Sequence, residues 1–154
     1  MRMTLVRLLV ASALILPCSA VAQEGGQFCV QVFFFRAFQN WGNHAFRPRA
    51  DASTSEAAVL EAFLGQFYEN RTPPKLVLIS HALSEPDVMQ EALALRAGRK
   101  VEVTVPQRGE KKDLVAYALN NAREALARQL AEGATQKALL EGVKEKFALE
   151  EVPR

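Results

Sequence analysis

The most constraining feature of this sequence is the order in which strand-like and helix-like apolar patterns follow one another. Residues 27–38 are rich in aromatic and β-branched side chains, residues 76–79 are continuously apolar, and residues 100–105 alternate between apolar and polar. Such runs are typical of β-strands. Apolar residues recur at helical spacing over four further segments: 55–69, 86–97, 110–132 and 135–147. This order predicts an α/β fold, with a small mixed sheet, an N-terminal β-hairpin, flanking helices and long C-terminal helices.

Turn and cap residues set the expected boundaries of these elements. Residues 39–43 (QNWGN) are expected to form the hairpin turn, followed by a short second strand. Ser53 and Glu56 have the spacing of a capping box at the start of the first helix. Ser84 is the expected cap of the second helix, and Gly133 is expected to separate the two C-terminal helices.

The first 22 residues differ from the rest of the chain. Arg2 and Arg7 precede an apolar run over residues 8–16, and Ala20-Val21-Ala22 forms a small-x-small site before Gln23. This pattern is typical of a secretory signal peptide, and the apolar run is too short for a permanent membrane span. The alternative is a buried N-terminal helix. We therefore expect two parts, a signal-peptide-like segment over residues 1–22 and a globular domain over residues 23–154.

The residue types needed for catalysis are sparse. Two cysteines, Cys18 and Cys29, cannot build a disulfide framework or a zinc site. The aspartates, Asp51, Asp87 and Asp113, fall in predicted loops or helix starts, whereas a two-metal nuclease needs converging carboxylates. Ser80 and His81 follow a predicted strand, and local hydrogen bonding explains such a histidine more simply than catalysis. We predict no catalytic residue, no metal ligand and no cofactor in this chain.

Basic residues gather around the last predicted strand. The chain has 19 basic and 17 acidic residues, so any nucleic-acid contact needs a local patch. The candidates are Arg99, Lys100, Arg108, Lys111 and Lys112, with Arg96 nearby. Gly109 lets the backbone approach a partner closely, and the amides of the following helix start favour an anion such as phosphate. The alternative is a solvated surface, with Glu110 and Asp113 compensating part of the charge.

A second, weaker basic group surrounds the predicted hairpin. It consists of Arg36, Arg47 and Arg49. The aromatic side chains nearby, Phe33, Phe35, Phe38, Trp41 and Phe46, could stack on nucleic-acid bases. Packing in the core is the commoner fate of such aromatic residues, and we favour it.

Several segments resemble the central region of the UvrC family. They are CVQVFFFRAFQNWGNHAF, LEAFLGQFYENRTPPKLVLISHAL, GRKVEVTVPQRGEKKDLVAYALNNAREAL and QKALLEG, and the likeness extends from about Glu24 to the end. Within them, PQRGEKK with the downstream NARE and FLGQFY are the most specific signatures. Two positions depart from the family pattern: Phe38 stands where a glycine is usual, and Arg47 stands where an aromatic residue is usual.

The resemblance implies part of the nuclease subunit of the UvrABC excinuclease, which acts in nucleotide excision repair and the response to DNA damage, including the SOS response. UvrC-like proteins carry a GIY-YIG nuclease module, a UvrB-binding motif, a region like this chain, an RNase H-like nuclease module and a helix-hairpin-helix tail. The resemblance therefore implies a segment that precedes the RNase H-like module and lacks both metal-dependent nuclease sites and the UvrB-binding motif. Its expected role is to scaffold the nuclease and position damaged DNA, with Arg108, Lys111 and Lys112 as phosphate contacts.

The N-terminal segment leaves two interpretations open. A truncated UvrC that stays in the cytoplasm would meet DNA and the UvrABC complex. An α/β binding module exported to the periplasm or secreted would have no role in DNA repair. We favour the truncated UvrC, because the leader-like segment ends where the family resemblance begins.

Overall fold

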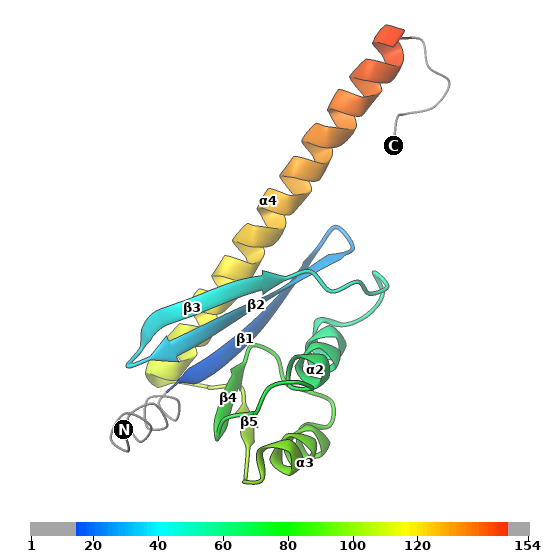
Figure 1. Ribbon diagram of the computed structural model, residues 1–154. Helices are drawn as coiled ribbons and strands as arrows, with labels where there is room; N and C mark the ends of the chain where they lie inside the picture. The colour runs from blue at the N-terminus through cyan, green and yellow to red at the C-terminus, as the bar shows by residue number, and fades with distance from the viewer. Residues whose placement is uncertain (1–14, 148–154) are drawn as a thin grey trace, which may run out of the picture.

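The computed structural model describes residues 15–147 and contains one five-stranded sheet. Its first three strands, β1 (Leu16–Glu24), β2 (Gln27–Arg36) and β3 (Gln39–Phe46), form an antiparallel meander. Strands β4 (Leu76–Ile79) and β5 (Glu102–Thr104) run parallel to β1. The strand order β3-β2-β1-β4-β5 places β1 at the centre of the sheet (Figure 1).

Helices cover both faces of the sheet (Figure 1). Helices α2 (Glu56–Phe67) and α3 (Pro86–Ala97) lie on one face, and the 39-residue helix α4 (Gly109–Phe147) lies across the other. The second half of α4 extends well beyond the sheet. The predicted α/β fold, a small mixed sheet with an N-terminal hairpin and flanking helices, is confirmed.

The two faces of β1 explain how the layers pack. Val21 points toward α2 and joins the larger core, which includes Val30, Leu60 and Leu64. The residues of β1 on the opposite face are small: Cys18, Ala20 and Ala22. They meet small residues of α4, Ala118, Ala122 and Ala125. Small side chains on both sides let the helix axis approach the sheet closely, which fixes α4 along β1.

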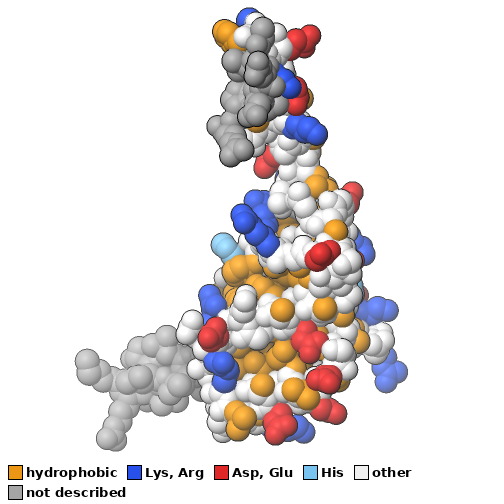
Figure 2. Space-filling model, turned by 90° about the vertical axis from the view of Figure 1, so that its right-hand side faces the viewer, with side chains coloured by type: hydrophobic (Ala, Val, Ile, Leu, Met, Phe, Trp, Pro, Cys, Tyr) orange, Lys and Arg blue, Asp and Glu red, His pale blue; other side chains and the backbone are white. Residues whose placement is uncertain are grey.

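The surface on the α2 and α3 side is mixed. Hydrophobic side chains group there between scattered charged ones (Figure 2). Val88 and Leu95 of α3 are exposed large hydrophobic residues. Among the described residues, no helix is both long enough and apolar enough to cross a membrane.

Strand β1 was not predicted. Residues 16–22 fall in the expected signal-peptide-like segment, but they are seven of the nine residues of the central strand. A short apolar run near the start of a sequence fits both a signal peptide and a β-strand. Only its pairing with β2 and β4 identifies it as a strand. The rest of the predicted leader, residues 1–14, lies outside the described residues, and cleavage after Ala22 stays an untested prediction.

Four predicted boundaries are wrong for local reasons. The N-cap of α3 is Glu85 and not Ser84, whose hydroxyl donates to Glu61. The β2–β3 turn is at Ala37 and Phe38, and residues 39–43 belong to β3. The cap of α2 is Ser55, whose Oγ accepts a hydrogen bond from the Ala58 amide, while Ser53 bonds to Asp51. The two predicted C-terminal helices are one helix, because Gly133 continues α4 without a break.

Candidate functional site

The five predicted DNA contacts are all exposed, but they come from two places in the fold. Arg99 and Lys100 lie in the loop that follows α3, whereas Arg108 precedes α4 and Lys111 and Lys112 lie in its first turn. Arg99 and Lys100 precede the edge strand β5, and the other three residues follow it, so the two groups lie toward opposite ends of that strand. The structure brings Arg108, Lys111 and Lys112 together at the start of α4.

The start of α4 has the electrostatic character of an anion site. Gly109 begins the helix with a φ of 77°, a left-handed conformation that glycine adopts without strain. The amides of the first helical turn have no partner within the helix and carry partial positive charge. Among residues 15–147, only His81 and Glu56 form an ion pair, so Arg108, Lys111 and Lys112 have no carboxylate of this part of the chain within ion-pair distance.

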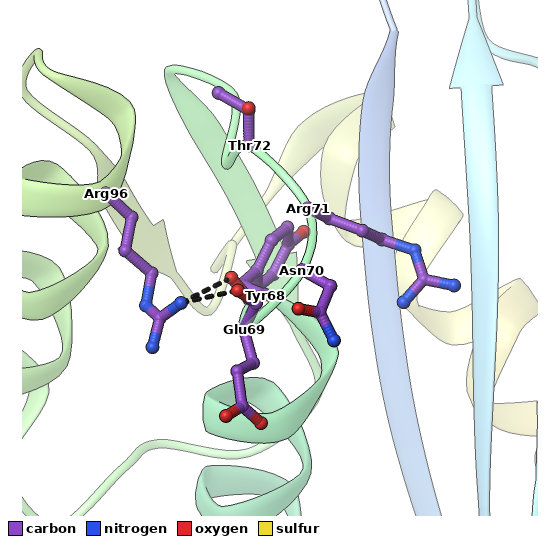
Figure 3. A pocket seen from close by; sticks show the side chains of 6 residues that line it. All are labelled: Tyr68, Glu69, Asn70, Arg71, Thr72 and Arg96. Carbon is purple, nitrogen blue, oxygen red and sulfur yellow. Dashed lines mark hydrogen bonds between the residues drawn. The ribbon is translucent and has the colours of Figure 1, made fainter.

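Arg96 does not belong to this basic group. Its Nη1 donates hydrogen bonds to the carbonyl oxygens of Glu69 at 2.6 Å and Tyr68 at 3.4 Å, at the end of α2 (Figure 3). These residues line a pocket of about 350 Å³ with Asn70, Arg71 and Thr72. Arg71 points away from Arg96 and lies over the Phe67 ring at 4.2 Å. Arg96 therefore satisfies carbonyl groups at a helix end, a role that its place in the sequence did not indicate.

A hydrogen-bonded chain joins Ser80, His81 and Glu56 beyond the end of β4. The Ser80 Oγ lies 2.7 Å from His81 Nδ1, and His81 Nε2 lies 2.7 Å from Glu56 Oε2. The same Oγ accepts a hydrogen bond from the Val21 amide at 3.1 Å. Because a hydroxyl can accept and donate at the same time, the Ser80 Oγ can bond to Nδ1 while it accepts from the Val21 amide. Val21 belongs to β1 and Glu56 belongs to α2, so Ser80 and His81 together connect α2 to the sheet. This agrees with the prediction that His81 forms local hydrogen bonds.

The donor set does not fit a divalent metal. Within residues 15–147, no three His, Cys, Asp or Glu side chains lie close enough to hold a metal ion. The strands carry two acidic residues, Glu24 at the end of β1 and Glu102 at the start of β5. These strands run in the same direction, so the two carboxylates lie toward opposite ends of the sheet. We derive no metal-dependent step from these residues.

Both cysteines are poor nucleophiles. Burial raises the pKa of the Cys18 thiol to about 12. Burial also raises the pKa of Cys29, although the charges of Arg47 and Arg128 partly oppose that shift. The thiolate is the reactive form, so both side chains act as small apolar residues of the α4 interface.

The aromatic residues of the hairpin divide between core and surface. Phe33 and Phe35 are buried, and both lie edge-on to Tyr117 of α4. Phe38 and Trp41 are exposed by 54% and 62%, and Arg36 lies over the Trp41 ring at 4.9 Å. Core packing, the favoured interpretation, holds for the first pair and fails for the second.

Comparisons with known proteins agree on one family. Residues 18–129 match the family model described as "UvrC Ribonuclease H-like domain". Over 135 residues, the chain is 57% identical to UvrABC system protein C of Chelativorans sp. and 58% identical to that of Brucella abortus. The protein of Nitrobacter hamburgensis is 55% identical. Each match covers 88% of this chain but only 20–22% of the relative, so the chain spans about a fifth of their length.

A solved structure shows a weaker likeness. The Bacteroides thetaiotaomicron protein with an actin-like ATPase fold is 9% identical, with a TM-score of 0.38 over 72% of this chain and 42% of that chain. This score is too low to support an argument about the fold.

The matched domain corrects one inference from the sequence. The resemblance implied a segment that precedes the RNase H-like module and lacks it, but the matched model is itself described as an RNase H-like domain. The physical reason lies in β1, because assigning residues 16–22 to a leader removed the central strand from the fold. The match starts at Cys18, inside that strand, and runs into α4. The chain therefore belongs to the UvrC family and contains its RNase H-like domain.

Proposed function

We propose that this domain acts in nucleotide excision repair as part of a UvrC-type subunit, where it contacts the DNA backbone and scaffolds incision without cutting DNA itself. The observation that carries the proposal is the group of three cations at the start of α4, beside the amides of the first helical turn. Glu110 is in the same turn, but none of the three cations lies within ion-pair distance of a carboxylate among residues 15–147. Phosphate oxygens are suited to such a site, since they accept hydrogen bonds from both amides and cations.

The lack of converging carboxylates supports a role in positioning. Phosphodiester cleavage by two metal ions needs several carboxylates around one point, and the described residues do not supply them. We place incision elsewhere in a UvrC-type protein and assign this domain to the cytoplasm, where chromosomal DNA and the UvrABC complex are found. Contact with UvrB is expected only through parts of such a subunit outside this chain.

The test measures DNA affinity of the full chain by fluorescence anisotropy over a range of salt concentrations. A labelled duplex is expected to bind with an affinity that falls as salt rises. Replacing Arg108, Lys111 and Lys112 together with alanine should lower the slope of log affinity against log salt by about 3, or about 1 per contact. The matched control is Lys137→Ala, an exposed cation in the far half of α4.

Two results would contradict the proposal. An equal loss of affinity in the Lys137→Ala control would show that charge at the start of α4 has no special role. Cleavage of the duplex by the purified chain in the presence of Mg²⁺ or Mn²⁺, absent in a mock purification, would show that the domain cuts DNA itself.

A further inference from the structure

A second cluster of cations surrounds a cleft at the opposite end of the sheet. The cleft has a volume of about 180 Å³ and lies where the β1–β2 turn, the loop after β3 and α4 meet. Its walls are residues 26–28, residues 47–50 and Gln129. Basic side chains gather at this level of the molecule, where α4 leaves the sheet (Figure 2).

Two arginines line this cleft, and a third, Arg128, precedes the lining residue Gln129 on α4. Arg47 and Arg49 line it, and no acidic residue is among the lining residues. The charges of Arg47 and Arg128 both lower the pKa of the Cys29 thiol, against the larger opposite effect of its burial. All three arginines are exposed, and none pairs with a carboxylate among residues 15–147.

The fold fixes this arrangement. Ala45 of β3 and Cys29 of β2 pack with Leu126 of α4, and the arginines follow two residues later, at positions 47 and 128. Hydrogen bonds hold the walls: Gln129 Nε2 donates to Gln27 Oε1 at 2.9 Å, and Gln23 Nε2 donates to the Ala52 carbonyl at 2.9 Å. Residues of β1, β2 and α4 therefore fix the walls of the cleft, which does not depend on surface loops alone.

A close approach at the turn keeps the cleft narrow. Gly26 has a φ of 74°, and a Cβ there would lie 3.3 Å from the Ala52 Cβ. The glycine lets the β1–β2 turn lie against the segment that follows Arg49. A guanidinium group offers planar pairs of donors that match phosphate oxygens, so the arginines suit a bidentate contact.

We propose that the Arg47–Arg49 cleft binds a phosphate group of the nucleic-acid backbone, as a contact separate from the start of α4. This inference rests on the proposed DNA-binding function and names a second site for it. Lys112 and Arg128 are 16 residues apart on one helix, which corresponds to about 24 Å at about 1.5 Å per residue. One phosphate cannot span that distance, so the two sites make separate contributions.

The first measurement is direct binding of inorganic phosphate to the isotope-labelled full chain by NMR. Saturable shifts are expected for the amides of Gly26, Gln27 and Ala50, which line the cleft. The double variant Arg47→Gln/Arg49→Gln should abolish these shifts, while Lys137→Gln should leave them unchanged. No saturable shift at these amides would overturn the proposal.

The second measurement is the salt dependence of duplex binding for the same variants. The double variant should lower the slope of log affinity against log salt by about 2. If it leaves the slope unchanged while the variants at the start of α4 reduce it, this inference fails and the proposed function stands. If the reverse holds, the cleft is the DNA contact and the assignment to the start of α4 fails.

A third outcome would show whether the cleft binds DNA or a small phosphate compound. If the full chain shows no salt-dependent DNA affinity, the proposed function fails, and with it the assignment of nucleic acid to the cleft. Phosphate shifts that the double variant abolishes would then identify a site for a small phosphate compound instead of a DNA contact.

Discussion

At the scale of single residues, the β2–β3 turn holds the most unusual backbone conformation. Its two central residues, Ala37 and Phe38, have φ values of 49° and 62°, although neither is glycine. Positive φ at both positions is the conformation of a type I′ turn, whose twist matches the twist of the flanking strands. In the β1–β2 turn, Gly25 and Gly26 fulfil the same requirement without strain.

We expect Phe38→Gly to raise the free energy of unfolding by about 1 kcal/mol, because it removes the clash of a Cβ in the left-handed region. The Phe38 side chain is 54% exposed, so little buried area is lost. Urea denaturation measures the change. The matched control is Phe38→Ala, which keeps the strained Cβ, and an equal gain in both variants would attribute the effect to the exposed ring.

Ser80 completes the hydrogen bonding of β1 where β4 ends. The backbone pairing of the two strands covers Cys18 and Ser19, after which the Ser80 hydroxyl accepts the bond from the Val21 amide. Val21 is fully buried, so its amide has no access to water.

Ser80→Ala should therefore lower the free energy of unfolding by about 1–3 kcal/mol, the cost of an unsatisfied buried donor. Ser84→Ala serves as the control, because its hydroxyl bonds to Glu61 at the exposed surface. The control should change stability by less than about 0.5 kcal/mol in the same urea titration. Equal effects of the two substitutions would show that the Val21 contact adds nothing.

The buried thiol of Cys18 predicts a loss of stability at alkaline pH. Its pKa rises from 9.0 to about 12 on folding, so the native thiol stays neutral while the unfolded thiol ionises. The stabilisation is complete below pH 9 and is lost as pH rises toward 12, by about 1 kcal/mol at pH 10. Unfolding free energies at pH 8 and pH 10 should therefore differ more for the wild type than for Cys18→Ala, and parallel profiles would contradict the assignment.

At the scale of elements, the strands and helices that the sequence predicts correctly are those with a local residue pattern. The aromatic run of β2, the buried stripe of α2 and the apolar run of β4 are all recognisable without knowledge of their neighbours. Strand β1 was missed, because its small residues indicate a strand only when α4 lies against them. The walls of the Arg47–Arg49 cleft come from the β1–β2 turn, the loop after β3 and α4, and Arg47 and Gln129 are 82 residues apart along the chain, so no local pattern could assemble them.

Helix α4 has two parts that differ in how far they pack against the sheet. From Leu114 to Leu126 it packs on the sheet, whereas Leu139, Val143 and Phe147 are exposed. The far part is therefore held mainly by its own backbone hydrogen bonds, and isolated helices of this length are marginal in water.

We expect amide hydrogen exchange to be faster in residues 131–147 than in residues 114–126. Gly133→Ala should slow exchange in the far part about fivefold, which corresponds to about 1 kcal/mol of helix propensity. The control is Gly65→Ala in α2, where a Cβ likewise meets nothing within 4 Å. It should leave exchange in residues 131–147 unchanged, and uniform protection along α4 would contradict the two-part description.

At the scale of the whole molecule, the central strand makes residues 16–22 part of the fold. A chain that begins at Gln23 would keep only Gln23 and Glu24 of β1 and would lose its pairing with β4. It would also lose the buried Cys18, Ala20 and Val21.

We therefore expect the chain without residues 1–22 to lack a cooperative unfolding transition, while the full chain has one. Near-ultraviolet circular dichroism during thermal denaturation measures the difference. The control is a chain without residues 1–14, which keeps all of β1. A cooperative transition in the shorter chain would show that β1 is dispensable and would restore the case for a cleaved leader.

The strand order also has a consequence for how the chain folds. Strands β1, β2 and β3 are neighbours in sequence and are joined by two-residue turns, so their pairing closes only short loops. Pairing of β4 with β1 joins Leu78 to Cys18, a separation of 60 residues, and costs far more loop entropy. We expect the meander to serve as the early template on which the parallel half assembles, so that synthesis from the N-terminus delivers the template first.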